Sequence, residues 1–282
     1  MKQPEAWSRY AERILATGAR LHFAPEPETL AVHARELAAA RTRLGRAPEV
    51  LVLGATPELA DLALGFGCRS RRVDCNPAMF AAAHKREESR DRSGETCIEA
   101  DWLDMPMLAD ASIDLVLGDN SLNNVAHEQM PRLLAELARV THAGSVLSLR
   151  QFVFPNTPMP GSLSVGRVVA RYRDGEFGAH EFSRALRYGS FVDAVWDPER
   201  RLLDAARVFE QIDAAHARGV FNTDEYAFMN GRRSQIQHTI YRHGEQVALF
   251  APLGRCRVER AGPVSDFEYA FAVWVIERSK PA

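Results

Sequence analysis

The spacing of hydrophobic residues changes near residue 49. Before it, apolar residues recur every three or four positions, which predicts amphipathic helices over residues 4–17 and 28–44. After it, short apolar runs alternate with helical periods, a pattern typical of a parallel sheet built from β-α-β units. We predict strands over residues 50–54, 70–74, 96–100, 113–118 and 146–153, and helices over residues 58–65, 77–88 and 128–140.

These elements predict an α/β fold, a doubly wound Rossmann-like sheet that is mostly parallel and has helices on both faces. The final segment, CRVERAGPVSDFEYAFAVWVIERS, has two β-rich stretches around a Gly-Pro turn, which predicts an antiparallel strand pair. Helical patterns over residues 162–172, 179–191 and 199–217 lie before it. We expect a single domain over 1–282, with an N-terminal helical cap (1–46), a ligand-binding core (47–154), a helical insertion that caps the substrate (155–235) and a C-terminal helix and strand pair (236–282).

Composition narrows the class of protein. The chain has 282 residues, 46% of them hydrophobic and 26% charged, which suits one large globular domain. Its formal net charge of -2 does not resemble the single-sign field of a nucleic-acid binder. No apolar run approaches a membrane span, and neither the cysteines nor the histidines have the spacing of a metal site. We therefore expect a reduced, cytoplasmic protein that acts in small-molecule metabolism, with no metal, nucleic-acid or membrane partner; its oligomeric state is left open.

The loop after the first predicted strand, GATPE, favours a particular ligand chemistry. Ligands of doubly wound sheets bind at the carboxyl ends of the strands, so Gly54 to Glu58 form part of the expected site. Thr56 suits a helix N-cap and Pro57 the first helical position. A carboxylate at Glu58 repels a pyrophosphate, whereas an adenosine ligand with cationic groups, such as S-adenosylmethionine, tolerates or uses it.

Polar residues also follow the next three strands. Asp74 lies 20 residues after Gly54, where such folds present an acid to ribose hydroxyls. Asp101 could accept from an adenine amino group, with Trp102 or Met79 covering the ring. The predicted cofactor-binding residues are Gly54, Ala55, Thr56, Glu58, Asp74, Cys75, Met79, Asp101, Trp102, Asp119, Asn120 and Ser121. Asp74 has an alternative role as a helix N-cap, and Asp119, Asn120 and Ser121 have one as turn residues.

The order of these motifs gives the segment a family resemblance. Residues 49–153, with VLVLG, VDCNP, ADWLDMP, IDLVLGDNSL and LARVTHAGSVLSLR, resemble the class I S-adenosylmethionine-dependent methyltransferases. The chain departs from that family at Val52, which stands where an acid is usual, and at Thr56-Pro57-Glu58, which replaces a glycine-rich segment. Glu58 could supply the missing carboxylate.

The resemblance implies methyl transfer from S-adenosyl-L-methionine, here to a small molecule. Candidate catalytic residues are Asp119, Asn120 and Tyr10, the last because an N-terminal helix often closes over the cofactor in that family. Arg150 and Gln151, at the end of the fifth strand, are candidates for binding an anionic group of the substrate. Two alternatives remain: a lyase or cyclase that consumes the same cofactor and releases methylthioadenosine, and a non-catalytic nucleoside-binding protein with this fold.

Overall fold

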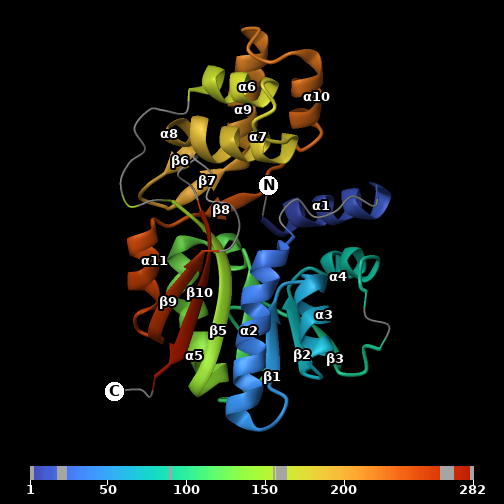
Figure 1. The fold of residues 1–282 in the computed structure, drawn as a ribbon, viewed down its shortest axis with the longest axis vertical. Helices are drawn as coiled ribbons and strands as arrows, with labels where there is room; N and C mark the ends of the chain where they lie inside the picture. The colour runs from blue at the N-terminus through green and yellow to red at the C-terminus, as the bar shows by residue number, and fades with distance from the viewer. Residues whose placement is uncertain are drawn as a thin grey trace.

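A mixed sheet of seven strands forms the centre of the molecule (Figure 1). The computed structural model describes residues 3–17, 24–88, 91–154, 156, 164–260 and 270–279. The strand order is β3-β2-β1-β4-β5-β10-β9; β1 to β5 run parallel, and β10 is antiparallel to both β5 and β9. The strands are β1 (Glu49–Leu53), β2 (Arg69–Asp74), β3 (Glu95–Glu99), β4 (Ile113–Asp119), β5 (Thr141–Val153), β9 (Gly254–Arg260) and β10 (Ala270–Arg278). The predicted fold class is confirmed, while the Gly-Pro turn lies outside the described residues.

The strand order reverses direction at β1, which lies between β2 and β4. Leu53, the last residue of β1, pairs with Val73 of β2 on one side and with Gly118 of β4 on the other. The carboxyl ends of three strands therefore meet at one edge, where connections leave toward opposite faces of the sheet. This is the place where doubly wound sheets bind ligands.

Helices cover both faces of the sheet, as the alternation of side chains along β1 requires. Val50 and Val52 pack with α2 and α3 on one face, and Leu51 and Leu53 lie in the cluster that contains α5 and α11 on the other. The helices around the sheet are α2 (Pro27–Leu44), α3 (Pro57–Gly65), α4 (Pro77–His84), α5 (Met130–Val140) and α11 (His243–Phe250). Val52 is completely buried in apolar surroundings, so it has no polar role at this position.

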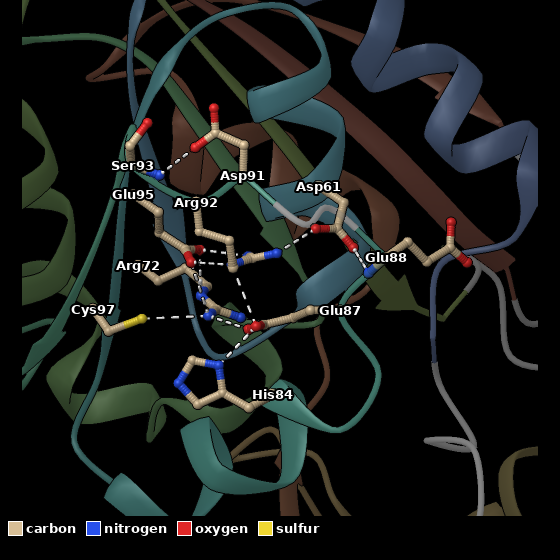
Figure 2. Close-up of polar contacts among 10 residues, drawn as sticks. All are labelled: Asp61, Arg72, His84, Glu87, Glu88, Asp91, Arg92, Ser93, Glu95 and Cys97. Carbon is tan, nitrogen blue, oxygen red and sulfur yellow. Dashed lines mark hydrogen bonds and ion pairs between the residues drawn. The ribbon is translucent and has the colours of Figure 1, made fainter.

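The helix predicted over 77–88 is too long, because α4 ends at His84 and the charged residues after it form ion pairs (Figure 2). Arg72 of β2, which is fully buried, forms ion pairs with Glu87, at 2.6 Å from Nη2 to Oε1, and with Glu95, at 2.9 Å from Nε to Oε1. Arg92 adds bonds to Asp61 at 2.5 Å and to Glu95 at 2.6 Å. This ion-pair cluster holds the segment that connects α4 with β3 against strand β2.

The segment after β5 forms a cap that stands above the carboxyl ends of the strands (Figure 1). The sequence predicts a helical insertion here, and the segment also contributes two strands, β6 and β7, of a small antiparallel sheet that β8 completes. The helix predicted over 199–217 begins at residue 205, because Asp204 caps it by accepting from the Ala206 N–H at 2.8 Å. The elements of the cap are α6 (Val165–Arg173), α7 (Ala179–Ala185), the π-helix η3 (Leu186–Ser190), α8 (Val192–Val195), β6 (Trp196–Asp197), β7 (Leu202–Asp204), α9 (Ala205–Ala217), α10 (Thr223–Asn230) and β8 (Gln237–Thr239).

The N-terminal helix α1 (Gln3–Thr17) lies between the cap and α4 (Figure 1). Its apolar face, which includes Tyr10 and Ile14, packs with Met79 and Phe80 of α4 and with Ile236 of the cap. In the part of the chain that the structure describes, no helix is long and apolar enough to cross a membrane.

Candidate functional site

A cavity of about 400 Å³ lies at the carboxyl ends of the strands, beneath α1 and the cap. Residues of the sheet, the first loop and α1 form one side of it, and residues of the cap form the other. Eleven of the twelve predicted cofactor-binding residues line it: Gly54, Ala55, Thr56, Asp74, Cys75, Met79, Asp101, Trp102, Asp119, Asn120 and Ser121. The candidate catalytic residue Tyr10 also lines the cavity. The structure thus brings these predicted residues together around one cavity, and their role in binding a cofactor stays a prediction.

Gly54 and Trp102 share one carbonyl at the bottom of the cavity. Val73 O accepts from the Gly54 N–H at 2.8 Å and from Trp102 Nε1 at 2.6 Å. Gly54 has a φ of +104°, which side-chain-bearing residues rarely adopt, and a Cβ there would lie 3.6 Å from the indole ring. The ring is thus fixed as a wall beside the bare backbone of the first loop.

Asp74 ends β2 with its carboxylate largely buried. Its Oδ1 accepts from the Asn76 N–H at 2.9 Å, and Asn76, not Asp74, caps α4 by accepting from Ala78 N at 3.0 Å. Burial raises the pKa of Asp74 to about 6, against the opposing effect of hydrogen bonds from the Asn76 and Ala55 backbone. At neutral pH the group is an anionic acceptor, which suits ribose hydroxyls.

Asp101, in contrast, lies at the exposed rim of the cavity. Its Oδ1 accepts from the Leu103 N–H at 2.9 Å, so part of its capacity is used in holding the turn after β3. Met79 of α4 is almost fully buried and lines the cavity together with Asp101 and Trp102. These three side chains come from different elements and offer an acceptor and two apolar surfaces to one ligand.

Asp119 ends β4 and forms a buried ion pair with Arg150 of β5. Arg150 Nη1 lies 2.9 Å from Asp119 Oδ1, and the two side chains are 1% and 3% exposed. Burial raises the pKa of Asp119 to about 6, while Arg150 opposes the shift. Arg150 itself is not among the residues that line the cavity. Its expected role, with Gln151, in binding an anionic substrate group is therefore wrong, because the sheet buries both side chains completely.

The turn after β4 connects the two sides of the cavity. Asn120 has a φ of +53° and donates its N–H to Arg150 O at 2.8 Å, and Ser121 Oγ donates to Leu53 O at 2.7 Å. Next in this turn, within η1 (Leu122–Asn124), Asn123 Nδ2 donates to Phe152 O at 3.1 Å and to Thr239 O of the cap at 2.7 Å. The amide of Asn123 thus connects the sheet with the cap.

Glu58 is the one predicted binding residue that does not line the cavity. Its Oε1 lies 2.6 Å from Nη2 of Arg86, at the start of the connection between α4 and β3. The expectation that Glu58 supplies the carboxylate missing at Val52 is therefore wrong, because Glu58 is paired with Arg86 outside the cavity. Thr56 occupies the N-cap position of α3 as predicted, but its side chain makes no capping hydrogen bond.

Sequence reasoning missed the residues with which the cap lines the cavity. Tyr188 of the cap lies against Phe152 of β5, with ring centroids 4.2 Å apart, and His238 and Ile240 complete this wall. Burial and the nearby Arg187 lower the pKa of His238 to about 3, so its imidazole is neutral at physiological pH. These residues carry no spacing signal, because the cap brings them to the site through tertiary packing alone.

Within the described ranges, no group of three or more histidine, cysteine, aspartate or glutamate side chains could hold a metal ion. The four cysteines are free. The polar groups of the cavity are instead the carboxylates and amides at the ends of β2, β3 and β4. Such an arrangement binds a ligand through hydrogen bonds and charge.

Comparison with known sequences assigns the sheet core to a family. Residues 51–149, from β1 to β5, match the methyltransferase domain family. No curated protein matches the chain in sequence. The match covers the first loop and the ends of β2, β3 and β4, the segments that build the sheet side of the cavity.

Several solved structures share the fold over nearly the whole chain. A Rhodobacter sphaeroides protein described as a zinc-dependent alcohol dehydrogenase is 17% identical, with a TM-score of 0.54 and 98% of each chain covered. The Burkholderia thailandensis 1,6-didemethyltoxoflavin N1-methyltransferase, solved with that compound and S-adenosylhomocysteine, is 14% identical, with a TM-score of 0.53 and coverage of 99% and 92%. The Bradyrhizobium japonicum N-methyltransferase NodS, solved with S-adenosylhomocysteine, is 11% identical, with a TM-score of 0.53 and coverage of 99% and 100%. At these identities the likeness is one of fold.

Proposed function

We propose that this chain, whose residues 51–149 match the methyltransferase domain family, is a class I S-adenosylmethionine-dependent methyltransferase that transfers the methyl group of that cofactor to a small molecule bound beneath the cap. One observation carries the proposal: three residues line the same cavity at the point where the strand order reverses. They are Gly54, which has no side chain in the first loop, Asp74, whose carboxylate is largely buried at the end of β2, and Trp102, whose ring lies beside Gly54. S-adenosylmethionine, when bound, supplies an electrophilic methyl group whose bond to sulfur breaks with its electron pair left on sulfur.

The lining residues fit the parts of this cofactor. Asp74 would accept from the ribose hydroxyls, and Asp101 from the adenine amino group, with Trp102 and Met79 against the ring. Gly54 and Thr56 lie where the chain between ribose and amino acid would pass. The lining carboxylates of Asp74, Asp101 and Asp119 would repel a pyrophosphate and favour a cofactor whose charged end includes cations.

The chain contributes to the reaction mainly by orientation and by excluding water. Tyr10 of α1, Phe152 of β5 and Tyr188 of the cap line the same cavity as the strand-end carboxylates. They would hold an acceptor against the cofactor in a space of about 400 Å³. Positioning of two reactants can lower a barrier by about 7 kcal/mol or more, so methyl transfer needs no dedicated base when the acceptor is already nucleophilic.

Calorimetry with S-adenosylhomocysteine tests the cofactor assignment. We expect binding to the full chain, and we expect Asp74→Ala to weaken it by about 1–3 kcal/mol because a buried hydrogen-bonded pair is lost. The matched control is Asp104→Ala, since Asp104 lies after the same strand as Asp101 but is exposed and does not line the cavity. Unchanged affinity in Asp74→Ala would remove Asp74 from the site.

Product analysis separates methyl transfer from the two alternatives. Incubation with S-adenosylmethionine and a panel of small acceptors should yield S-adenosylhomocysteine in amounts equal to the methylated product. Methylthioadenosine as the only nucleoside product would instead support a lyase or cyclase. Tight nucleoside binding without turnover across the panel would support a non-catalytic role.

A further inference from the structure

We propose that the methyl acceptor is an uncharged aromatic ring compound that lies against Phe152 and Tyr188 and donates a hydrogen bond to the side-chain carbonyl of Asn124. The inference rests on the proposed function and deepens it by naming the class of substrate. Asp74 and Trp102, which are assigned to the nucleoside, lie at the ends of β2 and β3. The part of the cavity toward β4, β5 and the cap is therefore left for the acceptor.

This acceptor half of the cavity is built by the turn after β4, by β5 and by the cap. It is lined by Asn124, Gln129, Phe152, Tyr188, His238 and Ile240. These side chains come from segments far apart in sequence, and they are apolar, aromatic or amide groups. The acceptor half thus differs in chemistry from the strand ends that carry the carboxylates.

Among the described residues, none that lines the acceptor half carries a charge. Burial, with Arg187 nearby, lowers the pKa of His238 to about 3, and burial raises the pKa of Tyr188, so both rings are neutral at physiological pH. Asp119, the carboxylate that ends β4, is paired with Arg150. A charged acceptor of either sign would leave water here without an opposite charge to meet it. An uncharged acceptor does not have this cost.

Aromatic rings from two separate hydrophobic clusters line the cavity. Phe152 and Tyr188 belong to the cluster of the cap, whereas Tyr10 belongs to the cluster that α1 forms with α4. A flat apolar ring that fills the space between these clusters would contact both of them. Aromatic rings gain additional energy from offset or tilted contacts with other rings, so an aromatic acceptor binds better here than a saturated one.

The side-chain amide of Asn124 offers a hydrogen-bond acceptor with a fixed orientation. Its Nδ2 donates to Asn120 O at 3.0 Å, and a reversed amide would place two oxygens against each other. Asn124 Oδ1 is buried, and no described residue donates to it. An unsatisfied buried carbonyl lowers stability. An N–H or O–H group of the acceptor would supply the missing donor.

The two neighbouring asparagines are placed differently. Asn123 uses both groups of its amide, which bond to Phe152 and to Thr239 of the cap, so it offers nothing to a ligand. Asn120 also has a buried Oδ1 without a described donor, but it directly follows β4, at the border with the nucleoside side. We therefore assign the recognition of the acceptor's donor group to Asn124.

Indole and benzofuran test this hydrogen bond, because they have nearly the same shape and only indole has an N–H donor. The full chain is first saturated with S-adenosylhomocysteine, so that the nucleoside side of the cavity is filled. In ligand-observed NMR titrations, indole should bind about fivefold or more tightly than benzofuran. Asn124→Ala should abolish this preference by weakening indole while leaving benzofuran within about twofold. The matched control Asn230→Ala, at an exposed asparagine of α10 that does not line the cavity, should keep it.

Two further pairs of probes test charge and aromaticity. An indole carboxylate should bind about tenfold or more weakly than the matching indole carboxamide, because the acceptor half has no cation to pair with it. Pyridone should bind about threefold or more tightly than its saturated counterpart, valerolactam, and Phe152→Leu should reduce this preference. Thermal unfolding shows whether each variant is folded, and the comparisons on the wild type do not depend on any variant.

The inference is overturned if benzofuran binds as tightly as indole, if the carboxylate or the saturated lactam is preferred, if Asn124→Ala keeps the preference for indole, or if none of the aromatic probes binds. When S-adenosylhomocysteine binds and one of these results is found, the proposed function stands and the inference alone fails. Failure of the wild type to bind S-adenosylhomocysteine would overturn both.

Discussion

Glu58 and Arg86 form an ion pair across two connections of the sheet, with 2.6 Å between Oε1 and Nη2, although they stand 28 positions apart in sequence. Their side chains are 17% and 18% exposed. The pair fixes the first turn of α3 to the segment after α4. It also withdraws from the cavity the carboxylate that the GATPE loop was expected to offer.

We predict that Glu58→Gln binds S-adenosylhomocysteine within about twofold of the wild type, because Glu58 does not line the cavity. The variant should lose at most about 1 kcal/mol of stability, since partly solvated ion pairs contribute little. Calorimetry and urea unfolding check the two statements. A loss of affinity of tenfold or more would return Glu58 to the site.

His33 makes stability depend on pH in a direction that can be isolated. Its pKa is lowered to about 3 in the folded protein, so between about pH 6.5 and 3 the unfolded chain binds one more proton at this residue. Stability from the neutral ring is present above pH 6.5 and is lost as the pH falls. In His33→Gln this loss is absent, so the unfolding free energy of the variant relative to the wild type should rise by up to about 1.4 kcal/mol per pH unit on acidification.

Urea unfolding of both proteins between pH 4.5 and 7.5 measures that difference. The comparison is needed because Asp74 and Asp119, whose pKa values are raised to about 6, act in the opposite direction: their contribution to stability is lost as the pH rises toward 6. A difference between His33→Gln and wild type that does not change with pH would contradict the assignment of a buried neutral imidazole.

Gly118 has no room for a side chain at the carboxyl end of β4. A Cβ there would lie 2.9 Å from Leu149 Cδ2 and 3.0 Å from Ser121 Oγ, which bonds to Leu53 O. We expect Gly118→Ala to destabilise the protein by about 1–3 kcal/mol through overpacking, and to weaken nucleoside binding by displacing the turn that carries Asp119.

The control for this substitution is Gly166→Ala in α6, where a Cβ would meet no heavy atom within 4 Å beyond the helix's own backbone. Alanine has the higher helix propensity, so this variant should be as stable as the wild type or gain up to about 1 kcal/mol. Thermal unfolding and calorimetry on both variants make the comparison. Equal stability of the two would show that Ser121 and Leu149 move aside freely.

Arg72 holds two carboxylates that are themselves almost completely buried (Figure 2). Arg72→Met should cost about 3–5 kcal/mol of unfolding free energy, because Glu87 and Glu95 would keep their charge without their buried partner. Adding Glu95→Gln should recover part of the loss. Urea unfolding of the single and double variants measures it, and a single variant as stable as the wild type would mean that Arg92 alone neutralises the cluster.

The sheet and its helices were predictable because their periodicity is long enough to be read from one sequence. Strands β1 to β4 and helices α1, α2, α3 and α5 lie close to their predicted ranges, whereas α4 ends four residues early and β5 begins at Thr141, five residues before its predicted start. The strands of the cap were missed because they have two or three residues, too few for a period of two to stand out. Asp204 ends β7 and also caps α9. The helical pattern over 199–217 gave no sign of this change from strand to helix.

The carboxylates and glycine of the site were predictable because topology alone brings the ends of parallel strands together. The partners of those residues were not, since Arg86, Arg150 and Asn123 act through contacts distant in sequence. An isolated arginine at a strand end gives no indication of whether it faces a ligand or lies inside the sheet. In the structure, burial inside the sheet keeps Arg150 out of the cavity, and an ion pair with Arg86 keeps Glu58 out of it.

Asn123 connects the cap to the sheet through its side-chain amide, which bonds to Phe152 and to Thr239, and the hydrophobic cluster of the cap takes in Phe152 and Phe154 from the end of β5. In a domain built in this way the cap can change its sequence, or be replaced by the cap of a relative, while the sheet side of the cavity stays the same. For engineering, a grafted cap would have to keep a partner for Asn123 and one for Glu26, which pairs with Arg184 of the cap.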